Sequence, residues 1–194
     1  MRMRYGMLLN NLRRFEEAQT ELEEAVKLNP TYAGAITNLG FVYFCKKDFV
    51  QAEQQFRKAL EFDEKFIPAH WYLSRCLWMQ GKKEESIKHV VNALNAQGNQ
   101  PLADKIEEKA RVSEPDDIIR FLINEWSSNP NMKDYMSLAT REMSLGEHEK
   151  ALVWLEKSFE EHQPTTIQIS VLPDFEPLRN EPRFRELLRK MNFK

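Results

Sequence analysis

The side chains best suited to acid–base or metal chemistry are four histidines, two cysteines and several pairs of adjacent carboxylates. None of them has the spacing of a catalytic or metal-binding motif; the histidines and cysteines are His70, His89, His148, His162, Cys45 and Cys76. Adjacent carboxylates such as Glu107 and Glu108 point to different faces of a helix, so they do not converge on one atom. The sequence also has no P-loop, GxGxxG, GxSxG, HExxH or CxxC motif. We therefore expect no enzyme activity, no cofactor and no metal site.

The composition of the 194 residues predicts a folded, helical and charge-rich protein. Hydrophobic residues make up 42% and charged residues 30%, while glycine occurs only six times. The 28 basic and 30 acidic residues give a net charge of −2 and are evenly spread, which argues against nucleic-acid binding. No apolar run approaches the ~20 residues of a membrane span, and the first residues do not read as a signal peptide. Because the two cysteines suggest buried free thiols, we expect a cytoplasmic protein. Because the apolar runs are short, we expect no membrane binding.

Small and aliphatic residues recur through the first half of the chain at intervals of 34 residues. Four columns keep this interval over three copies: Gly6–Gly40–Ser74, Ala18–Ala52–Ser86, Leu22–Phe56–Val90 and Ala25–Ala59–Ala93. Each copy is predicted to be two helices joined by a tight turn, over 2–13 with 16–28, 32–45 with 49–62, and 67–79 with 83–96. The small residues mark close approaches between helices, and Gly40 is expected to face Ala52 and Ala59.

This pattern resembles the tetratricopeptide repeat (TPR) family. In the second copy the resemblance is carried by Leu39, Gly40, Tyr43, Ala52, Phe56 and Ala59. It implies an all-α, right-handed superhelical solenoid of antiparallel helix pairs with a C-terminal capping helix. Such repeats present binding surfaces and say little about chemistry. Residues 1–98 would form three of these units.

The second half of the chain repeats less regularly. A fourth unit is predicted over 131–164, on Leu138, Ala139, Gly146, Ala151, Leu155 and Ser158. The intervening residues 99–130 have two amphipathic stretches on either side of a break at Pro115, but they lack the small-residue columns. We interpret them as a degenerate helical pair or linker. A change in superhelix geometry, or a boundary between sub-domains, is expected there.

Residues 165–194 are predicted to form a C-terminal cap. A short helical turn over 174–179 precedes a helix from Pro182 to about Asn192, with an apolar stripe on Phe184, Leu187, Leu188 and Met191. The spacing DFxPLRxxPRFxxLLxxM resembles the ends of TPR regions in bacterial multidomain signalling proteins. The first unit starts inside its own first helix, so either that helix is short or the chain is cut from a longer protein.

In TPR arrays the first helix of each unit lines a concave surface, and the resemblance places the partner-binding residues there. The candidate groove residues are Met3, Met7, Asn38, Phe41, Phe44, Trp71, Tyr72, Arg75, Trp78 and Met79. Trp, Tyr and Arg are enriched at binding hot spots, and Met adapts to varied apolar partners. The expected roles are anchors at Trp71, Tyr72 and Trp78, an adjoining wall at Phe41 and Phe44, and hydrogen-bonding groups at Asn38 and Arg75. The alternative is that the aromatic side chains pack between units, or are covered by the chain's own tail or a second copy.

Two binding modes known in the family do not fit this surface. A clamp for a peptide's terminal carboxylate would need Lys, Asn and Arg side chains at positions that here hold Met3, Met7, Asn38, Pro68 and Tyr72, and only Asn38 matches. An asparagine ladder would need Asn throughout a column that reads Arg4, Asn38 and Tyr72. The remaining interpretation is an apolar, aromatic groove with Arg4, Asn38 and Arg75 as polar groups.

The sequence therefore predicts a non-enzymatic scaffold that binds a peptide or helix of a partner protein in an aromatic concave groove, with a homodimer also considered. The alternative is a regulatory or oligomerisation module of a larger bacterial signalling protein, which the tail motif favours. RNA binding through helical repeats is a weaker hypothesis, because basic residues do not cluster along the chain.

Overall fold

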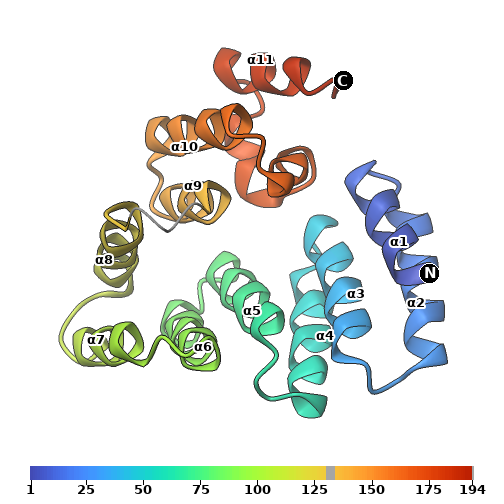
Figure 1. Cartoon of the computed structure of the whole chain (residues 1–194), viewed down its shortest axis with the longest axis horizontal. Helices are drawn as coiled ribbons and strands as arrows, with labels where there is room; N and C mark the ends of the chain where they lie inside the picture. The colour runs from blue at the N-terminus through green and yellow to red at the C-terminus, as the bar shows by residue number, and fades with distance from the viewer. Residues whose placement is uncertain (130–133, 194) are drawn as a thin grey trace. The chain divides into compact units, whose positions relative to one another are not determined.

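The computed structural model describes residues 1–129 and 134–193, and all the regular structure in them is helical (Figure 1). The chain divides into two compact units, Met1–Pro115 and Asp116–Lys194. Within the described residues, no helix is both long enough and apolar enough to cross a membrane. The predicted all-α fold class is confirmed.

The first unit consists of three helix pairs followed by a single helix. The pairs are α1 (Arg2–Asn11) with α2 (Phe15–Leu28), α3 (Ala33–Cys45) with α4 (Phe49–Phe62), and α5 (Ile67–Met79) with α6 (Lys83–Ala96); α7 (Gln100–Ala110) follows and packs on α6. Every helix of the three pairs begins and ends within two residues of its predicted bounds. The first helices also touch one another, α1 with α3 and α3 with α5, so they share one side of the row.

The two helices of the second pair meet at Gly40. A Cβ atom at this position would lie 2.7 Å from Cε1 of Phe56 and 3.1 Å from Cβ of Gln55. The first distance is shorter than real Cβ contacts and the second is tighter than most of them, so only glycine fits without movement of the Phe56 ring. The nearest neighbours of Gly40 are therefore Phe56 and Gln55, whereas Ala52 and Ala59 were expected there.

At the positions equivalent to Gly40, the helices of the other two pairs approach each other through different contacts. A Cβ atom at Gly6 would lie 2.8 Å from Cγ of Leu22, so the first pair also needs glycine. The third pair has serines instead, and the hydroxyl groups of Ser74 and Ser86 form a buried hydrogen bond of 3.0 Å. The 34-residue repeat thus preserves close approach between helices by two different contacts.

The turn inside each pair passes through the left-handed region of backbone conformation. Arg13, Lys47 and Gly81 occupy equivalent positions, with φ angles of 61°, 65° and 76°. Each donates its backbone N–H over 2.9 Å to the carbonyl three residues earlier. Gly81 marks this turn in the sequence, because glycine adopts positive φ without steric cost. Arg13 and Lys47 give no such signal.

Successive pairs are joined by apolar contacts. Leu39 and Val42 of α3 share a buried cluster with Ala18 and Leu22 of α2. A second cluster joins α3 to α4 and α5 through Ala33, Ile36, Ala59 and Ala69. Helices α3 and α5 therefore pack both on their own partners and on the second helix of the preceding pair.

The second unit contains the predicted fourth pair and the tail. Its elements are α8 (Pro115–Ser127, of which Pro115 belongs to the first unit), α9 (Tyr135–Ser144), α10 (His148–Glu160), the 3₁₀ helices η1 (Pro164–Ser170) and η2 (Pro173–Leu178), and α11 (Pro182–Lys190). Helices α9 and α10 form the pair expected over 131–164, although the boundary placed between 130 and 131 lies outside the described residues. The segment 99–130 supplies α7 to the first unit and nearly all of α8 to the second. The four-part domain division stays a prediction.

The tail packs on α10. Phe175, Phe184 and Leu187 are buried, and Arg183 holds both carboxylate oxygens of Glu156 at 2.9 and 2.7 Å. Helix α11 ends at Lys190, two residues before its predicted end. The 3₁₀ helix η1 was not predicted, because such short elements carry no helical periodicity.

Candidate functional site

Aromatic rings of α3 and α5 form one connected group. The Phe41 ring centroid lies 4.8 Å from that of Tyr72 and 6.5 Å from that of Phe44. Phe44 in turn lies 5.5 Å from Phe49 at the start of α4. Phe41 and Phe44 are almost completely buried, with 0% and 1% exposure. They were expected to line an open wall, but in the structure they support the more exposed side chains of α5.

Two cations lie over aromatic rings of α3 and α5. The guanidinium carbon of Arg75 is 5.2 Å from the Phe44 ring centroid, and Nζ of Lys83 is 4.8 Å from the Trp78 ring. These distances are in the range of cation–π interactions, which hold a cation and a ring together at a partly wet surface. The sequence did not indicate Lys83, because it belongs to α6, the second helix of the pair.

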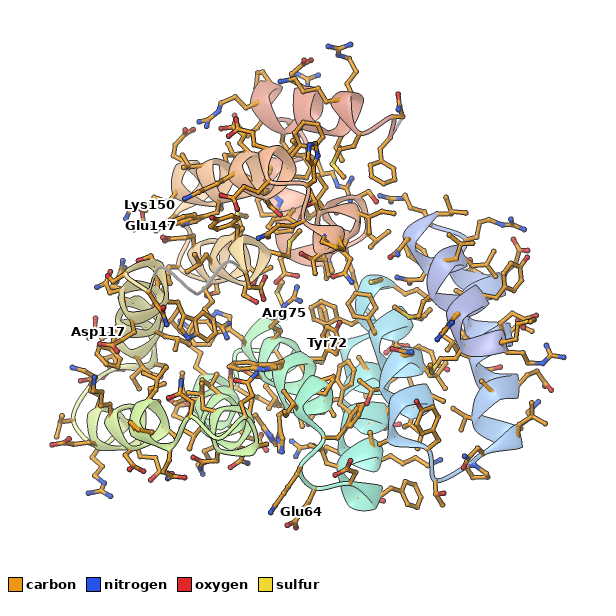
Figure 2. All side chains as sticks on the ribbon, viewed as in Figure 1. Glu64, Tyr72, Arg75, Asp117, Glu147 and Lys150 are labelled. Atoms are coloured by element: carbon orange, nitrogen blue, oxygen red, sulfur yellow. The ribbon has the colours of Figure 1, made fainter. Side chains whose placement is uncertain are left out.

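Five α5 side chains form a face that remains partly exposed; we call Trp71, Tyr72, Arg75, Trp78 and Met79 the α5 surface. Their spacing of one, three, three and one residues places them on one side of the helix. Figure 2 shows Tyr72 and Arg75 projecting from the same side of α5, with Glu64 on the turn at the other edge of the unit. This face combines three large aromatic groups, one thioether and one positive charge.

The predicted residues of α1 and α3 contribute less to an exposed surface. Met3 and Met7 are half-buried and pack on the cluster between the first two pairs. Asn38 is half-buried on α3. The structure thus brings Phe41, Phe44 and the α5 surface together and places the two methionines with the core. Whether any of these residues contacts a partner stays a prediction.

Glu53 of α4 connects the second helix pair to the turn between α5 and α6 through its carboxylate. It accepts hydrogen bonds from Arg57 Nη2 (2.8 Å), Gln80 Nε2 (2.7 Å) and Lys82 Nζ (2.8 Å). Burial by itself raises the pKa of Glu53, but the bonds from these partners outweigh it and lower the pKa to about 2. The carboxylate is therefore ionised at neutral pH and ties α4 to the third pair. This network does not follow from the sequence pattern, because its members lie on two different pairs.

Two of the four histidines meet beside a cavity of about 740 Å³. The Nδ1 atoms of His70 and His89 are 3.0 Å apart, and His70 Nε2 donates to the carbonyl oxygen of Glu64 over 2.8 Å. Burial, the neighbouring His70 and Arg57 lower the pKa of His89 to about 4, so this ring is neutral at pH 7. In the described part of the chain no group of three His, Cys, Asp or Glu side chains converges on a metal position. The pair is a polar contact between α5 and α6 at the cavity wall.

A family model described as "Tetratricopeptide repeat" matches residues 1–32, which span α1, α2 and the turn after them. The fold of the described helices agrees with this match. The chain therefore contains a tetratricopeptide repeat and has a TPR-like fold. Proteins of this family generally mediate protein–protein interactions.

Known proteins similar to this chain cover different shares of it. Superkiller complex protein 3 of Mus musculus is 36% identical over 89 residues, which are 46% of this chain and 6% of that protein. Tetratricopeptide repeat protein 6 of Homo sapiens is 42% identical over 48 residues, which are 25% of this chain and 9% of that protein. The matched segments thus span less than a tenth of these relatives. The crystal structure of TTC0263, a thermophilic TPR protein in Thermus thermophilus, is similar with a TM-score of 0.54 and 17% identity, over 88% of this chain and 95% of that chain. This likeness shows the fold.

Proposed function

We propose that this protein is a non-enzymatic scaffold that binds a peptide or helix of a partner protein on the α5 surface. The observation that supports the proposal is the set of large side chains on one face of α5, Trp71, Tyr72 and Trp78, which remain partly exposed. Buried Phe41 and Phe44 hold this face from beneath. Large, rigid aromatic groups at a partly exposed position are typical of binding hot spots.

The chemistry of the α5 surface favours one kind of partner. Its rings offer apolar contact area, while Arg75 and Lys83 place two positive charges beside them. A partner segment with apolar side chains next to carboxylates would bury the rings and complement both charges. We therefore propose a short apolar–acidic segment, in extended or helical form, as the bound element.

Peptide display against the purified chain tests this proposal. Apolar–acidic peptides should be enriched, and Trp78→Ala should weaken their binding by about tenfold or more. Val153→Ala is the matched control, because Val153 is an exposed apolar residue on α10, which belongs to the second unit and not to the α5 surface. Unchanged peptide affinity in a Trp71→Ala, Trp78→Ala double variant that retains its helical circular dichroism would contradict the proposal. Phe41→Ala is unsuitable as a binding test, because emptying a fully buried ring site costs about 3–5 kcal/mol of stability.

The second candidate is a regulatory or oligomerisation module of a larger protein. It is favoured by the similarity to segments that make up only 6% and 9% of much longer relatives. The tail spacing around Phe175 and Phe184 supports the bacterial signalling version of this candidate. The complete reading frame distinguishes the two: an adjoining catalytic or DNA-binding domain supports the module, and a frame limited to these residues with a monomer in light scattering excludes it.

A cytoplasmic location belongs to the same proposal. Cys45 and Cys76 are both buried and form no disulfide, and burial raises the pKa of Cys76 to about 12. Cysteines outside disulfides persist as thiols in a reducing compartment. Cell fractionation followed by thiol labelling of the unfolded chain checks this, and a secreted or oxidised protein would contradict it.

A further inference from the structure

The cavity beside His70 and His89 lies between the second and third helix pairs. Its walls come from α4, the turn that follows α4, α5 and α6, and all of its lining residues fall within 57–96. Its volume of about 740 Å³ lies in the range of sites for small ligands, about 300–1,000 Å³. The cavity is therefore large enough for a small organic molecule or for one side chain of a partner.

The hydrogen bonds of the two histidines determine which ring nitrogens carry protons. The Glu64 carbonyl oxygen can only accept, so His70 Nε2 carries the hydrogen of their 2.8 Å bond. A neutral His70 with this proton has a lone pair on Nδ1. The 3.0 Å contact between the two Nδ1 atoms then requires His89 Nδ1 to donate. Because His89 is neutral at pH 7, its remaining lone pair lies on Nε2.

The Nε2 atom of His89 is available to a ligand. It makes no hydrogen bond to any described residue. The ring is half-buried, and Nε2 is not among the fully enclosed polar atoms that lack a partner. A small molecule can therefore reach this lone pair, which accepts a hydrogen bond and donates none. The bond between the two Nδ1 atoms holds the ring in this orientation, as a built site requires.

Other acceptors surround the lone pair. Glu61 and Glu64 line the cavity with exposed carboxylates, and neither forms an ion pair with a described residue. Asn92 and Asn95 lie three residues apart on α6, so their amide groups share one face of the helix. The wall between these polar groups is apolar and consists of Leu60, Leu73 and Ala96.

The positive charges of the cavity are fewer than its acceptors. Arg57 lines the cavity, but its guanidinium already bonds to Glu53 at 2.8 Å and to Glu85 at 2.7 Å. Lys65 is then the lining cation that opposes the two exposed carboxylates. An anion would face these carboxylates and a nitrogen that cannot donate. A cation with several N–H donors and an apolar stem would complement the cavity instead.

We propose that this cavity binds a primary alkylammonium group, carried by a free amine or by a lysine side chain. The ammonium would donate hydrogen bonds to His89 Nε2 and to a carboxylate of Glu61 or Glu64, while its alkyl chain would lie on Leu60 and Leu73. The site differs from the α5 surface in its residues and in its ligand. It does not depend on the function proposed for that surface.

NMR of the complete chain with ¹⁵N-labelled histidine tests the site, because protonated and unprotonated ring nitrogens have clearly different shifts. At pH 7 His89 should show a protonated Nδ1 and an unprotonated Nε2. The probes are butylamine and Nα-acetyl-lysine N-methylamide, and each should shift the Nε2 signal in a saturable way. Acetylation of the lysine probe at Nε removes its charge and should weaken binding by about tenfold or more. Binding of both probes shows that the cavity admits a lysine side chain, and binding of butylamine alone assigns it to free amines.

Substitutions at the rim test the role of charge. Glu61→Gln with Glu64→Gln should weaken amine binding by about threefold or more at low salt, because the ammonium loses both carboxylates. Both residues are exposed, so the double variant should keep its fold. The matched control is Glu107→Gln with Glu108→Gln, which removes two exposed acids of α7 outside the cavity and should leave the affinity unchanged.

Four results would overturn the proposal. The first is a proton on His89 Nε2 at pH 7, since the acceptor would then be absent. The second is the lack of a saturable shift with either amine. The third is equal affinity for the lysine probe and its Nε-acetylated form. The fourth is equal affinity in the rim variant and its α7 control. None of these results bears on peptide binding by the α5 surface, whose variants leave the cavity unchanged.

Discussion

At the scale of single residues, Glu53 should make the stability of the first unit depend on pH. Its pKa falls from an ordinary value of 4.5 to about 2 in the folded chain. The folded state therefore holds this proton less tightly than the unfolded state. The stabilisation is fully present above pH 4.5 and is lost as pH falls toward 2, and we expect a loss of about 1–3 kcal/mol.

Urea unfolding at a series of pH values measures this effect. Glu53→Gln removes the titrating group, so the variant should be less stable at pH 7 and its stability should change less between pH 4.5 and 2. Glu61→Gln is the matched control, because Glu61 is an exposed acid on the same helix. Equal pH dependence in wild type and Glu53→Gln would show that the hydrogen bonds to Glu53 contribute no net stability.

His89 should make the stability of the first unit depend on pH over a higher range than Glu53 does. Its pKa is lowered from 6.5 to about 4, so the unfolded state binds the proton more tightly. Stability is then full above pH 6.5 and decreases as pH falls toward 4. The groups facing this ring are His70, Arg57, Glu85 and Glu53. An NMR titration should show the His89 resonance moving only below pH 5, while His89→Gln should flatten the stability curve between pH 4 and 6.5. A His89 midpoint near 6.5 would contradict the buried, neutral ring.

At the scale of elements, the turns inside the helix pairs give a test of backbone strain. Lys47 has a φ of 65°, a conformation that costs a residue with a Cβ about 1–2 kcal/mol. At the equivalent Gly81 no atom lies within 4 Å of an ideal Cβ position, so a side chain would meet no steric clash there. The positive φ is therefore the source of strain for a residue with a Cβ. Lys47→Gly should raise the free energy of unfolding by about 0.5–1 kcal/mol, and Gly81→Ala should lower it by about 1 kcal/mol.

Chemical denaturation of the two variants checks both signs. Lys46→Gly is the control, because Lys46 has an ordinary helical φ of −75°, and glycine there should destabilise the chain. Stabilisation by both glycine substitutions, or by neither, would contradict the strain at Lys47.

These elements also show why the sequence predicts the helix pairs well and their turns less well. Columns such as Gly6 and Gly40 reflect a steric requirement that only small residues meet, so the pairs are visible in the sequence. The turn at Lys47 is held by the two helices around it, and the residue itself does not favour positive φ. The helix η1 is too short to show a period, and its attachment depends on a hydrogen bond of 2.7 Å between the hydroxyl groups of Ser158 and Thr166.

The sequence predicts which helix faces form the candidate site, but it does not predict how deeply each side chain is buried. Periodicity places Phe41 and Tyr72 on the inner sides of two neighbouring first helices. Which of the two rings lies beneath the other depends on the packing of α3 against α5, and no pattern within one helix contains that information. The contact between His70 and His89 likewise arises from the packing of two helices of one pair, on residues whose spacing matches no motif.

At the scale of the whole molecule, the tryptophans are distributed so that each unit can be followed separately. Trp71 and Trp78 belong to the first unit, and Trp126 and Trp154 belong to the second. In a repeat array each element contacts mainly its neighbours, so stability is close to a sum of local terms and nearest-neighbour terms. A substitution in the second helix pair should therefore affect the two sets of tryptophans unequally.

Gly40→Ala provides that test. Its Cβ would lie 2.7 Å from the Phe56 ring, and forced repacking of this kind costs about 1–3 kcal/mol. With 5-fluorotryptophan incorporated, the ¹⁹F signals of Trp71 and Trp78 should lose their folded positions at lower urea concentration than in wild type, while those of Trp126 and Trp154 should shift much less. Ala139→Leu is the mirror variant, because Ala139 is fully buried in α9, and it should reverse the order. A common shift of all four signals in both variants would mean that the chain unfolds as one cooperative body. If only local and nearest-neighbour interactions contributed to stability, a substitution in one helix pair would not destabilise every other pair equally.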